Sequence, residues 1–483
     1  MEIRSQDVLT AYLTLILAIT SVTTSNYDYK RVLHLSLLFY EAQRSGHLPP
    51  NNRIPWRGDS ALNDRGENGE DLTGGYYDAG DFVKFSFTMA STTTLLAWGC
   101  LSYKEAYYQA GEWKNMLDAL KWATDYFMKC HVSDYEFYGQ VGSFQLDHGY
   151  WGRPEEMNMS RPAYKIDAQH PGSDLAGEVA AALAATSLVF EDISPEYASL
   201  CLKHAKQMYK FATRYRGLYH ETFKGAALFY ESTGYGDELT WAAAWLFRAT
   251  GNDHYLDEAE QHYINYRLRE RPNEFFYNKK VAGVQVLLAQ ITYRDEYLDA
   301  VQSFCDYSMH RQTRTPKGLV FIEKIGTLCH AANIAFVCLQ AANLTTSFKV
   351  YKEFAKSQIH YMLGDAGRSY VIGFGENYPM QPYHAASSCY DSEPCGWAEF
   401  SRHAPNPHVL SGALVSGPDV NDYYEDLREE YIYNEVTLDY NAGFQSAVAG
   451  LQHWQMQEAK IPKQKYFNTR SHNFITTINK TYA

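Results

Sequence analysis

The feature that most constrains this fold is a helical spacing of apolar residues that recurs along almost the whole chain. Apolar side chains repeat every three to four positions in a dozen segments, as on one face of an α-helix. The segments are 29–46, 85–107, 113–131, 173–190, 195–215, 237–250, 253–268, 280–291, 296–310, 328–342, 348–363 and 442–455. Alternating strand patterns are few and short, and the clearest is 369–374. The pattern predicts an all-α protein.

The connections between these segments are unequal in length. If successive helices run antiparallel, the loops that lead into even-numbered helices all lie at one end of the scaffold. Those loops are 47–84, 132–172, 222–236, 269–279, 311–327 and 364–441. Long ordered loops gathered at one end typically carry a functional site, whereas insertions that are merely tolerated would not be segregated in this way. We therefore expect a cleft at that end.

The N-terminus is typical of a secreted protein. An apolar run at 8–19 is followed by small polar residues, which predicts a signal peptide over 1–25, although its charged end is weak. Three glycosylation sequons, at Asn158, Asn343 and Asn479, agree with an extracellular location. No linker rich in proline, serine or threonine follows. We expect one domain over 26–458 and a polar extension over 459–483.

Composition limits the kinds of partner that the chain can bind and the roles that its cysteines can have. The net charge of −13 and the lack of Lys/Arg runs argue against nucleic acid, and no segment after the signal is expected to span a membrane. The 40 tyrosines suit a wet cleft that holds sugars or peptides, or helix seams. Cys389 and Cys395 flank a short polar loop and are predicted to form a disulfide. The other six cysteines lie in helical patterns as buried thiols. We expect a monomer with no organic cofactor, and no CxxC or HExxH motif indicates zinc.

Two stretches carry the candidate chemistry. The glycine-rich segment 71–81 (DLTGGYYDAGD) holds Asp78 and Asp81 close together, either as a pair that activates water or as a calcium-binding turn. Near the other end, Glu435 lies among tyrosines just before the last helical segment. An apolar environment raises the pKa of a carboxyl group, so Glu435 is a candidate general acid, with an acidic helix cap as the alternative. Two carboxyl groups on one face meet the requirement of glycoside hydrolysis.

Segment 71–81, together with PGSD at 171–174, NPHVL at 406–410 and NEVTLDYNAGF at 434–444, resembles glycoside hydrolase family 9. The resemblance extends from about residue 27 to 454. It implies an (α/α)6 barrel, six helical hairpins around a closed core, and inverting hydrolysis of β-1,4-glucan, as in endoglucanases. A mannosidase or lyase barrel would carry different motifs.

The resemblance also implies roles for individual residues. Asp81 corresponds to the general base, Asp78 to its partner in holding water, and Glu435 to the general acid, with Asp426 as the other acidic member of the signature. His148 and Trp151 lie in a segment that contributes to the sugar cleft. Trp151 is expected to be a stacking platform, or else a structural loop aromatic.

The chain departs from the family at sugar-binding positions. Tyr383-His384-Ala385 stands where the family has His-His-Arg, so Tyr383 and His384 are the candidate substrate contacts there and an arginine is lost. Ile325 and Cys329 replace a tryptophan and another arginine, and Phe82 follows the DAGD motif in place of the usual histidine. These losses raise an alternative hypothesis, a non-catalytic or weakly active carbohydrate-binding derivative of the fold.

A calcium site is the one cofactor that the resemblance implies. Many family members bind calcium near a segment that corresponds to 233–238, where Asp237 and Glu238 offer hard oxygen ligands. The alternative is that both carboxylates stabilise the N-terminus of the helix that follows.

Overall fold

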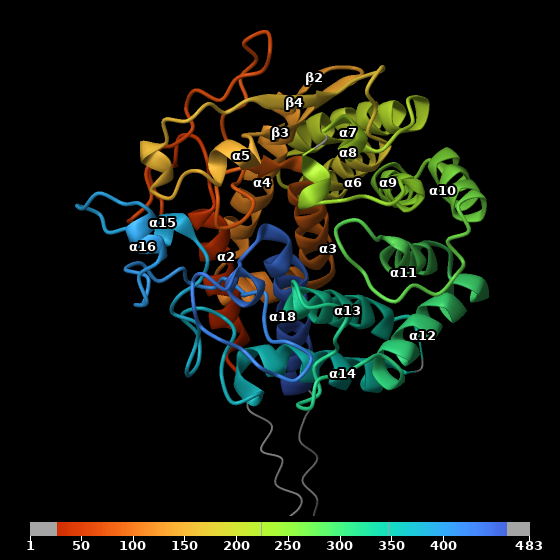
Figure 1. Ribbon diagram of the computed structural model, residues 1–483. Coiled ribbons are helices and arrows are strands. Elements are labelled where there is room, and N and C mark those ends of the chain that lie inside the picture. Colours follow the sequence, from red (N-terminus) through yellow and green to blue (C-terminus); the bar gives the residue numbers. More distant parts are fainter. Residues whose placement is uncertain (1–26, 224, 346, 461–483) are drawn as a thin grey trace, which may run out of the picture.

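Six helices form a closed inner ring in the computed structural model, which describes residues 27–460 apart from 224 and 346 (Figure 1). In chain order they are α3 (Ser86–Ala110), α6 (Ser173–Phe190), α9 (Gly236–Thr250), α11 (Val281–Thr292), α13 (Thr327–Ala342) and α18 (Leu438–Lys460). Each inner helix packs against the next, and α18 returns to pack against α3. The last helix of the barrel thus lies directly beside one of the first.

Six further helices cover this ring from outside. They are α2 (Tyr29–Ala42), α4 (Trp113–Cys130), α7 (Pro195–Arg214), α10 (Asp253–Asn265), α12 (Asp295–His310) and α14 (Phe348–His360). Each outer helix packs on an inner helix adjacent to it in the chain, except that α2 packs on α18 as well as α3. The arrangement is the predicted (α/α)6 barrel.

The two layers differ in how their residues are buried. Every residue of α13 is buried, whereas α10 buries only one stripe, which includes Ala259 and Tyr263. An inner helix contacts protein on all sides and is therefore apolar around its circumference, while an outer helix is amphipathic. One described helix, α6, is long and apolar enough to cross a membrane, but 94% of it is buried inside the protein.

Small residues let the inner helices approach closely. A Cβ atom on Gly443 of α18 would lie 1.9 Å from Asn333 Oδ1 of α13. Where α3 meets α18, a Cβ on Gly99 of α3 would lie 2.5 Å from Ser446 Oγ. A side chain at either position would force the ring apart, because closely packed interiors tolerate little added volume.

A small antiparallel sheet lies on the loop side of the barrel. The central strand β3 (Glu136–Val141) pairs with β1 (Lys84–Phe85), β2 (His131–Ser133) and β4 (Ala163–Ile166). The predicted strand at 369–374 is wrong, because that segment forms only an isolated bridge between Val371 and Leu414. Its alternating pattern reflects a buried loop rather than a ladder partner.

The remaining elements are short and lie in the connections. They are α5 (Phe144–Asp147), η1 (Pro154–Glu156), α8 (Tyr219–Thr222), η2 (Ala226–Leu228), η3 (Tyr361–Asp365), α15 (Ala385–Ser388), α16 (Trp397–Phe400) and α17 (Tyr431–Asn434). The predicted signal peptide, the sequon at Asn479 and most of the predicted extension lie outside the described residues. The helix α18 continues to Lys460, two residues into the predicted extension.

The cysteine predictions are confirmed. Cys389 and Cys395 form a disulfide with their Cα atoms 5.4 Å apart. The other six cysteines are free and buried.

Candidate active site

The loop over 71–83 is fixed to the barrel from three directions. Gln43, at the end of α2, donates its side-chain amide to the carbonyl oxygens of Tyr77 (3.2 Å) and Ala79 (2.6 Å). The Leu438 N–H donates to the Asp78 carbonyl at 2.9 Å, which joins this early loop to the start of the last helix. Gly80 lies so close to the Tyr383 carbonyl that a Cβ there would be 2.1 Å from the oxygen. The loop therefore needs glycine at this position.

Asp78 is the buried member of the predicted pair. Its side chain is 1% exposed, and its two oxygens accept hydrogen bonds from the Thr88 and Tyr230 hydroxyls. Burial and then the nearby Asp439 carboxylate raise the pKa of Asp78 well above its ordinary value. With both oxygens engaged by hydroxyl groups, Asp78 is oriented rigidly against the floor of the pocket.

Asp81 is the accessible member. One of its oxygens lies 3.0 Å from His148 Nε2, and the other, Oδ1, has no hydrogen-bond partner among the described residues. The contact with Asp81 raises the pKa of His148, which favours a ring that donates this hydrogen bond. A carboxylate held through one oxygen and unpartnered at the other is arranged to accept a proton.

Glu435 follows the short helix α17 and precedes α18. Its backbone is held by the hydrogen bond from Ser416 N–H to the Glu435 carbonyl (2.8 Å) and by a bridge to Tyr383. Burial, then the Asp81 and Asp439 carboxylates, raise the pKa of Glu435 to about 8. This carboxyl group therefore holds a proton at neutral pH, as a general acid must.

Asp81 and Glu435 line one cavity of about 450 Å³. The residues that line it are Asp78, Ala79, Asp81, Phe85, His148, Leu228, Phe229, Tyr230, Ile325, Tyr383, Tyr431 and Glu435. Most of them come from the loops expected to share one end of the barrel, which confirms that prediction. Segment 269–279 contributes no lining residue.

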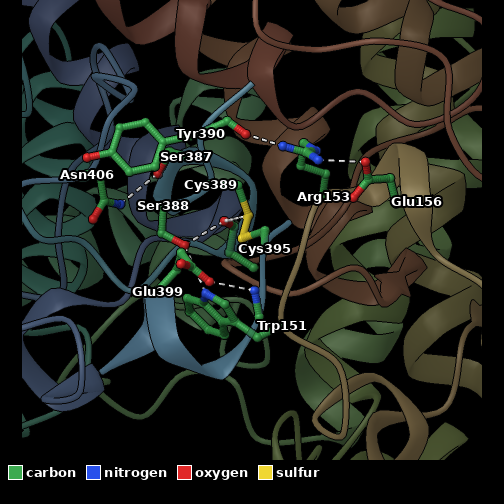
Figure 2. Close-up of a disulfide and its surroundings, with 12 residues drawn as sticks. Trp151, Arg153, Glu156, Ser387, Ser388, Cys389, Tyr390, Cys395, Glu399 and Asn406 are labelled. Atoms are coloured by element: carbon green, nitrogen blue, oxygen red, sulfur yellow. Dashed lines mark hydrogen bonds and ion pairs between the residues drawn. A yellow bond between two sulfur atoms is a disulfide. The ribbon is translucent and has the colours of Figure 1, made fainter. Parts of the chain in front are cut away.

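Three of the predicted catalytic and substrate-binding residues, Trp151, His384 and Asp426, do not line this cavity. Trp151 is only 4% exposed, donates Nε1–H to Ser388 Oγ (2.8 Å; Figure 2) and packs against Tyr383, so the structural alternative holds and the stacking platform expected at Trp151 is wrong. His384 is buried as well, and its Nε2 lies 2.8 Å from the Gln43 side-chain oxygen. It supports the amide that holds the Asp78 loop and does not face the sugar cleft.

Asp426 binds backbone N–H groups of a neighbouring segment and does not line the cavity. Its carboxylate accepts the N–H groups of Met380 (2.8 Å) and Gln381 (3.0 Å). These bonds position the segment that delivers Tyr383 to the cavity. Asp426 is therefore a positioning residue, and Tyr383 and His148 are the predicted substrate-binding residues that reach the cavity.

Sequence reasoning missed four residues that set the chemistry of the site. Thr88 and Tyr230 hold Asp78, and no signal separates Tyr230 from the other 39 tyrosines. Asp147 accepts the Phe82 N–H at 3.1 Å, and burial and Asp81 raise its pKa to about 7. Asp439 is 5% exposed, and its charge acts on both Asp78 and Glu435. Its place four residues after Glu435 in the motif was the available signal.

The residues that depart from the family pattern differ in location and exposure. Ile325 lines the cavity and is 46% exposed, so an aliphatic side chain stands at its rim. Cys329 is fully buried behind Asp439, with Sγ 3.5 Å from the Asp439 carbonyl oxygen. Phe82 is buried against Tyr77, with ring centroids 5.2 Å apart. These replacements leave the carboxyl groups in place and reduce the charged donors for a sugar.

The predicted calcium ligands lie apart from the catalytic cavity, at the start of α9. Glu238 is fully buried, and neither of its carboxylate oxygens has a hydrogen-bond partner among the described residues. The same holds for Oδ1 of Asn278, whereas Asp237 accepts the Lys280 N–H at 2.7 Å. Among the described residues, no group of three or more His, Cys, Asp or Glu side chains could hold a metal. A cation here would need amide or carbonyl oxygens as well as the two carboxylates.

A helical barrel whose cavity is lined by two carboxyl groups, one of them with a raised pKa, has the arrangement that glycoside hydrolysis requires. Comparison with known proteins places the chain among the glycoside hydrolases. The sequence profile described as Glycosyl hydrolase family 9 matches residues 29–448. The chain belongs to this family and is an enzyme.

Individual relatives agree over nearly the whole chain. Endoglucanase A of Bacillus pumilus is 42% identical over 91% of this chain and 68% of its own length. The solved endoglucanase of the termite Nasutitermes takasagoensis is 55% identical, with a TM-score of 0.88 over 89% of this chain and all but 1% of its own. Endoglucanase CelQ of Clostridium thermocellum, solved with cellobiose and cellotriose, is 34% identical with a TM-score of 0.80, over 95% of this chain and 74% of its own.

Proposed function

We propose that this chain is a secreted, inverting endo-β-1,4-glucanase that hydrolyses cellulose or a related β-glucan. The observation that carries the proposal is the division of labour in one cavity: Asp81 has an unpartnered oxygen, and Glu435 has a pKa of about 8. Asp81 takes a proton from water while Glu435 protonates the leaving oxygen. His148 holds Asp81 in place, and Asp78 helps to hold the attacking water.

Reducing-sugar release from carboxymethylcellulose, lichenan and mixed-linkage glucan tests this function. Asp81→Asn and Glu435→Gln should each remove the activity without unfolding the protein, and the first sugar product observed by NMR should have the inverted, α configuration. Activity that survives both substitutions would refute the assignment. A β product would refute inversion alone.

The non-catalytic alternative is not favoured. It was motivated by the replacement of sugar-binding side chains, such as arginine by Ala385 and Cys329. Asp81, Glu435 and His148, which contacts Asp81, nevertheless line one cavity. Binding of β-glucan oligosaccharides by the wild-type protein without any turnover would reverse this judgement.

We also propose a structural calcium ion bound by Asp237 and Glu238 with the Asn278 amide oxygen. Its support is the buried, unpartnered carboxylate of Glu238, because an isolated buried charge is costly without a cation. When bound, calcium would neutralise that charge and fix the start of α9. Chelation should lower the melting temperature of the wild type and not that of Glu238→Gln. Glu67→Gln, at an exposed position, is the control and should respond to chelation as the wild type does. An equal loss of melting temperature in the wild type and Glu238→Gln would refute the site.

Secretion as a monomer after removal of residues 1–25 completes the proposal. It rests on the N-terminal pattern and on the exposed Asn158 and Asn343 of two sequons. N-terminal sequencing of the protein from culture medium and light scattering test it. Retention of residues 1–25 would contradict the signal peptide, and a stable dimer would contradict the monomer.

A further inference from the structure

Trp397 is a large aromatic side chain that remains half exposed next to the active site. It begins the short helix α16, and 49% of its surface is accessible. Trp151 and Phe400 support the ring from within the protein, with centroids 6.0 and 5.3 Å away. The Trp397–Trp151 pair is tilted by 37°, and Phe400 meets Trp397 nearly edge-on at 81°. Trp397 is thus seated on an aromatic base with its outer surface open.

This aromatic base connects Trp397 to the catalytic cavity. Trp151 contacts Tyr383 with a centroid separation of 5.2 Å, and Tyr383 lines the cavity beside Glu435. Phe400 contacts both Trp151 (4.8 Å) and Tyr383 (6.1 Å). Trp397 is therefore connected through Trp151 to Tyr383, which lies at the cavity wall.

The segment that presents Trp397 is held rigidly. The disulfide between Cys389 and Cys395 closes the loop just before it (Figure 2), and the Gly396 N–H donates to the Glu399 carboxylate at 2.7 Å. The guanidinium group of Arg428 is 2% exposed and donates to the backbone carbonyls that follow Trp397. Its acceptors there are Glu399 (2.6 Å), Phe400 (3.0 Å), Arg402 (2.8 Å) and Ala404 (2.9 Å). A ring fixed before binding loses little conformational freedom when a ligand stacks on it.

We propose that Trp397 is a stacking platform for a sugar unit of the β-glucan chain beyond the catalytic cavity. The proposal rests on the glucanase function proposed above. Tryptophan presents an apolar face with a polar edge, which suits the C–H face of a pyranose ring. Trp397 takes the role that sequence reasoning assigned to Trp151, which lies beneath it. It also supplies contact area near Ala385, where a guanidinium group of the family pattern is missing.

Chain-length dependence of hydrolysis tests the proposal. Trp397→Ala should raise KM for cellohexaose by about three- to tenfold, the loss expected for one aromatic contact. It should leave KM for cellotriose unchanged, because a short chain that fills the cavity does not reach Trp397. Trp397→Phe should recover most of the affinity. Identical kinetics of wild type and Trp397→Ala on both oligosaccharides would overturn the proposal, as would an equal loss on both.

A matched control is available at Tyr108, which is 48% exposed near the end of α3. That residue lies roughly 30 Å along the helix from the active-site end, so Tyr108→Ala should change neither KM. A second variant keeps the tryptophan and removes its brace: Cys389→Ser with Cys395→Ser should raise KM for cellohexaose selectively. An unchanged KM in this double variant would contradict the claim that a rigid loop presents the ring.

Measuring oligosaccharide binding to the inactive Glu435→Gln variant tests the stacking role of Trp397 separately from the proposed glucanase activity. Calorimetry of cellohexaose with Glu435→Gln and with Glu435→Gln/Trp397→Ala should show weaker binding to the double variant by the same factor. Equal binding refutes the platform even if the wild type hydrolyses glucan. A wild type that binds through Trp397 but hydrolyses no glucan refutes only the catalytic assignment.

Discussion

The pH dependence of hydrolysis follows from the environment of Glu435. With its ordinary pKa of 4.5, a glutamic acid would be protonated in about 0.3% of molecules at pH 7. With the raised pKa of about 8, the protonated fraction at pH 7 is about 90%. The environment of the side chain thus increases the population of competent general acid by about 300-fold at neutral pH.

We therefore expect kcat/KM to fall on the alkaline side with a midpoint near pH 8. The assay is initial rates on a soluble β-glucan between pH 4 and 10, with stability checked at each pH. An alkaline limb near pH 5 would refute the assignment of Glu435 as a buried acid. Because the carboxyl groups in the cavity interact, the midpoint is a property of the cluster, and a variant is needed to assign it.

Asp439→Asn provides that assignment. The Asp439 carboxylate is one cause of the raised pKa of Glu435, so removing its charge should move the alkaline limb to lower pH. Glu435→Gln should lower kcat by about 10²- to 10⁴-fold and abolish the limb. A limb that does not move in Asp439→Asn would show that another group controls it.

Three further outcomes are expected. The pKa of Glu435 is raised in the folded state, so the wild type loses stability as pH rises from about 4.5 to about 8. In this window the unfolding free energy of Glu435→Gln, measured with urea, should gain up to about 1.4 kcal/mol per pH unit relative to the wild type. A difference between the two proteins that does not change with pH would contradict this. His148→Ala should lower kcat more than it raises KM, because His148 holds Asp81; a change confined to KM would instead mark a sugar contact. Arg428→Ala should cost on the order of 3 kcal/mol in unfolding free energy, since several partly buried carbonyls lose a charged donor. A cost near zero would show that water replaces the guanidinium.

Helical periodicity was sufficient to predict an all-α protein, whereas the closed barrel was implied only by the resemblance to the family. The start of α7 at Pro195 and the end of α9 at Thr250 agree with prediction. The strand predicted at 369–374 failed because the same alternating pattern also occurs in a loop that is buried almost throughout. The strands that do form are two to six residues long, too short to produce a clear alternating pattern in the sequence.

The site was predictable where chemistry depends on residue type and less so where it depends on burial. Asp78, Asp81 and Glu435 were found because motifs mark them. Trp151 was misjudged since sequence does not reveal which of several neighbouring aromatics, here Trp151 or Trp397, faces solvent. His384 and Asp426 were placed near the substrate but act through Gln43 and through the backbone N–H groups of 380–381.

The hydrogen bond from Leu438 to Asp78 joins an early and a late part of the chain, which has a consequence for when the active site can form during synthesis. The base enters at residue 81 and the acid at residue 435, so a ribosome must complete most of the chain before both halves of the catalytic pair exist. The ring of inner helices also lacks its closing member until α18 has been synthesised. Chains that end before α18 lack Glu435 or the closing helix of the ring and are therefore expected to be inactive.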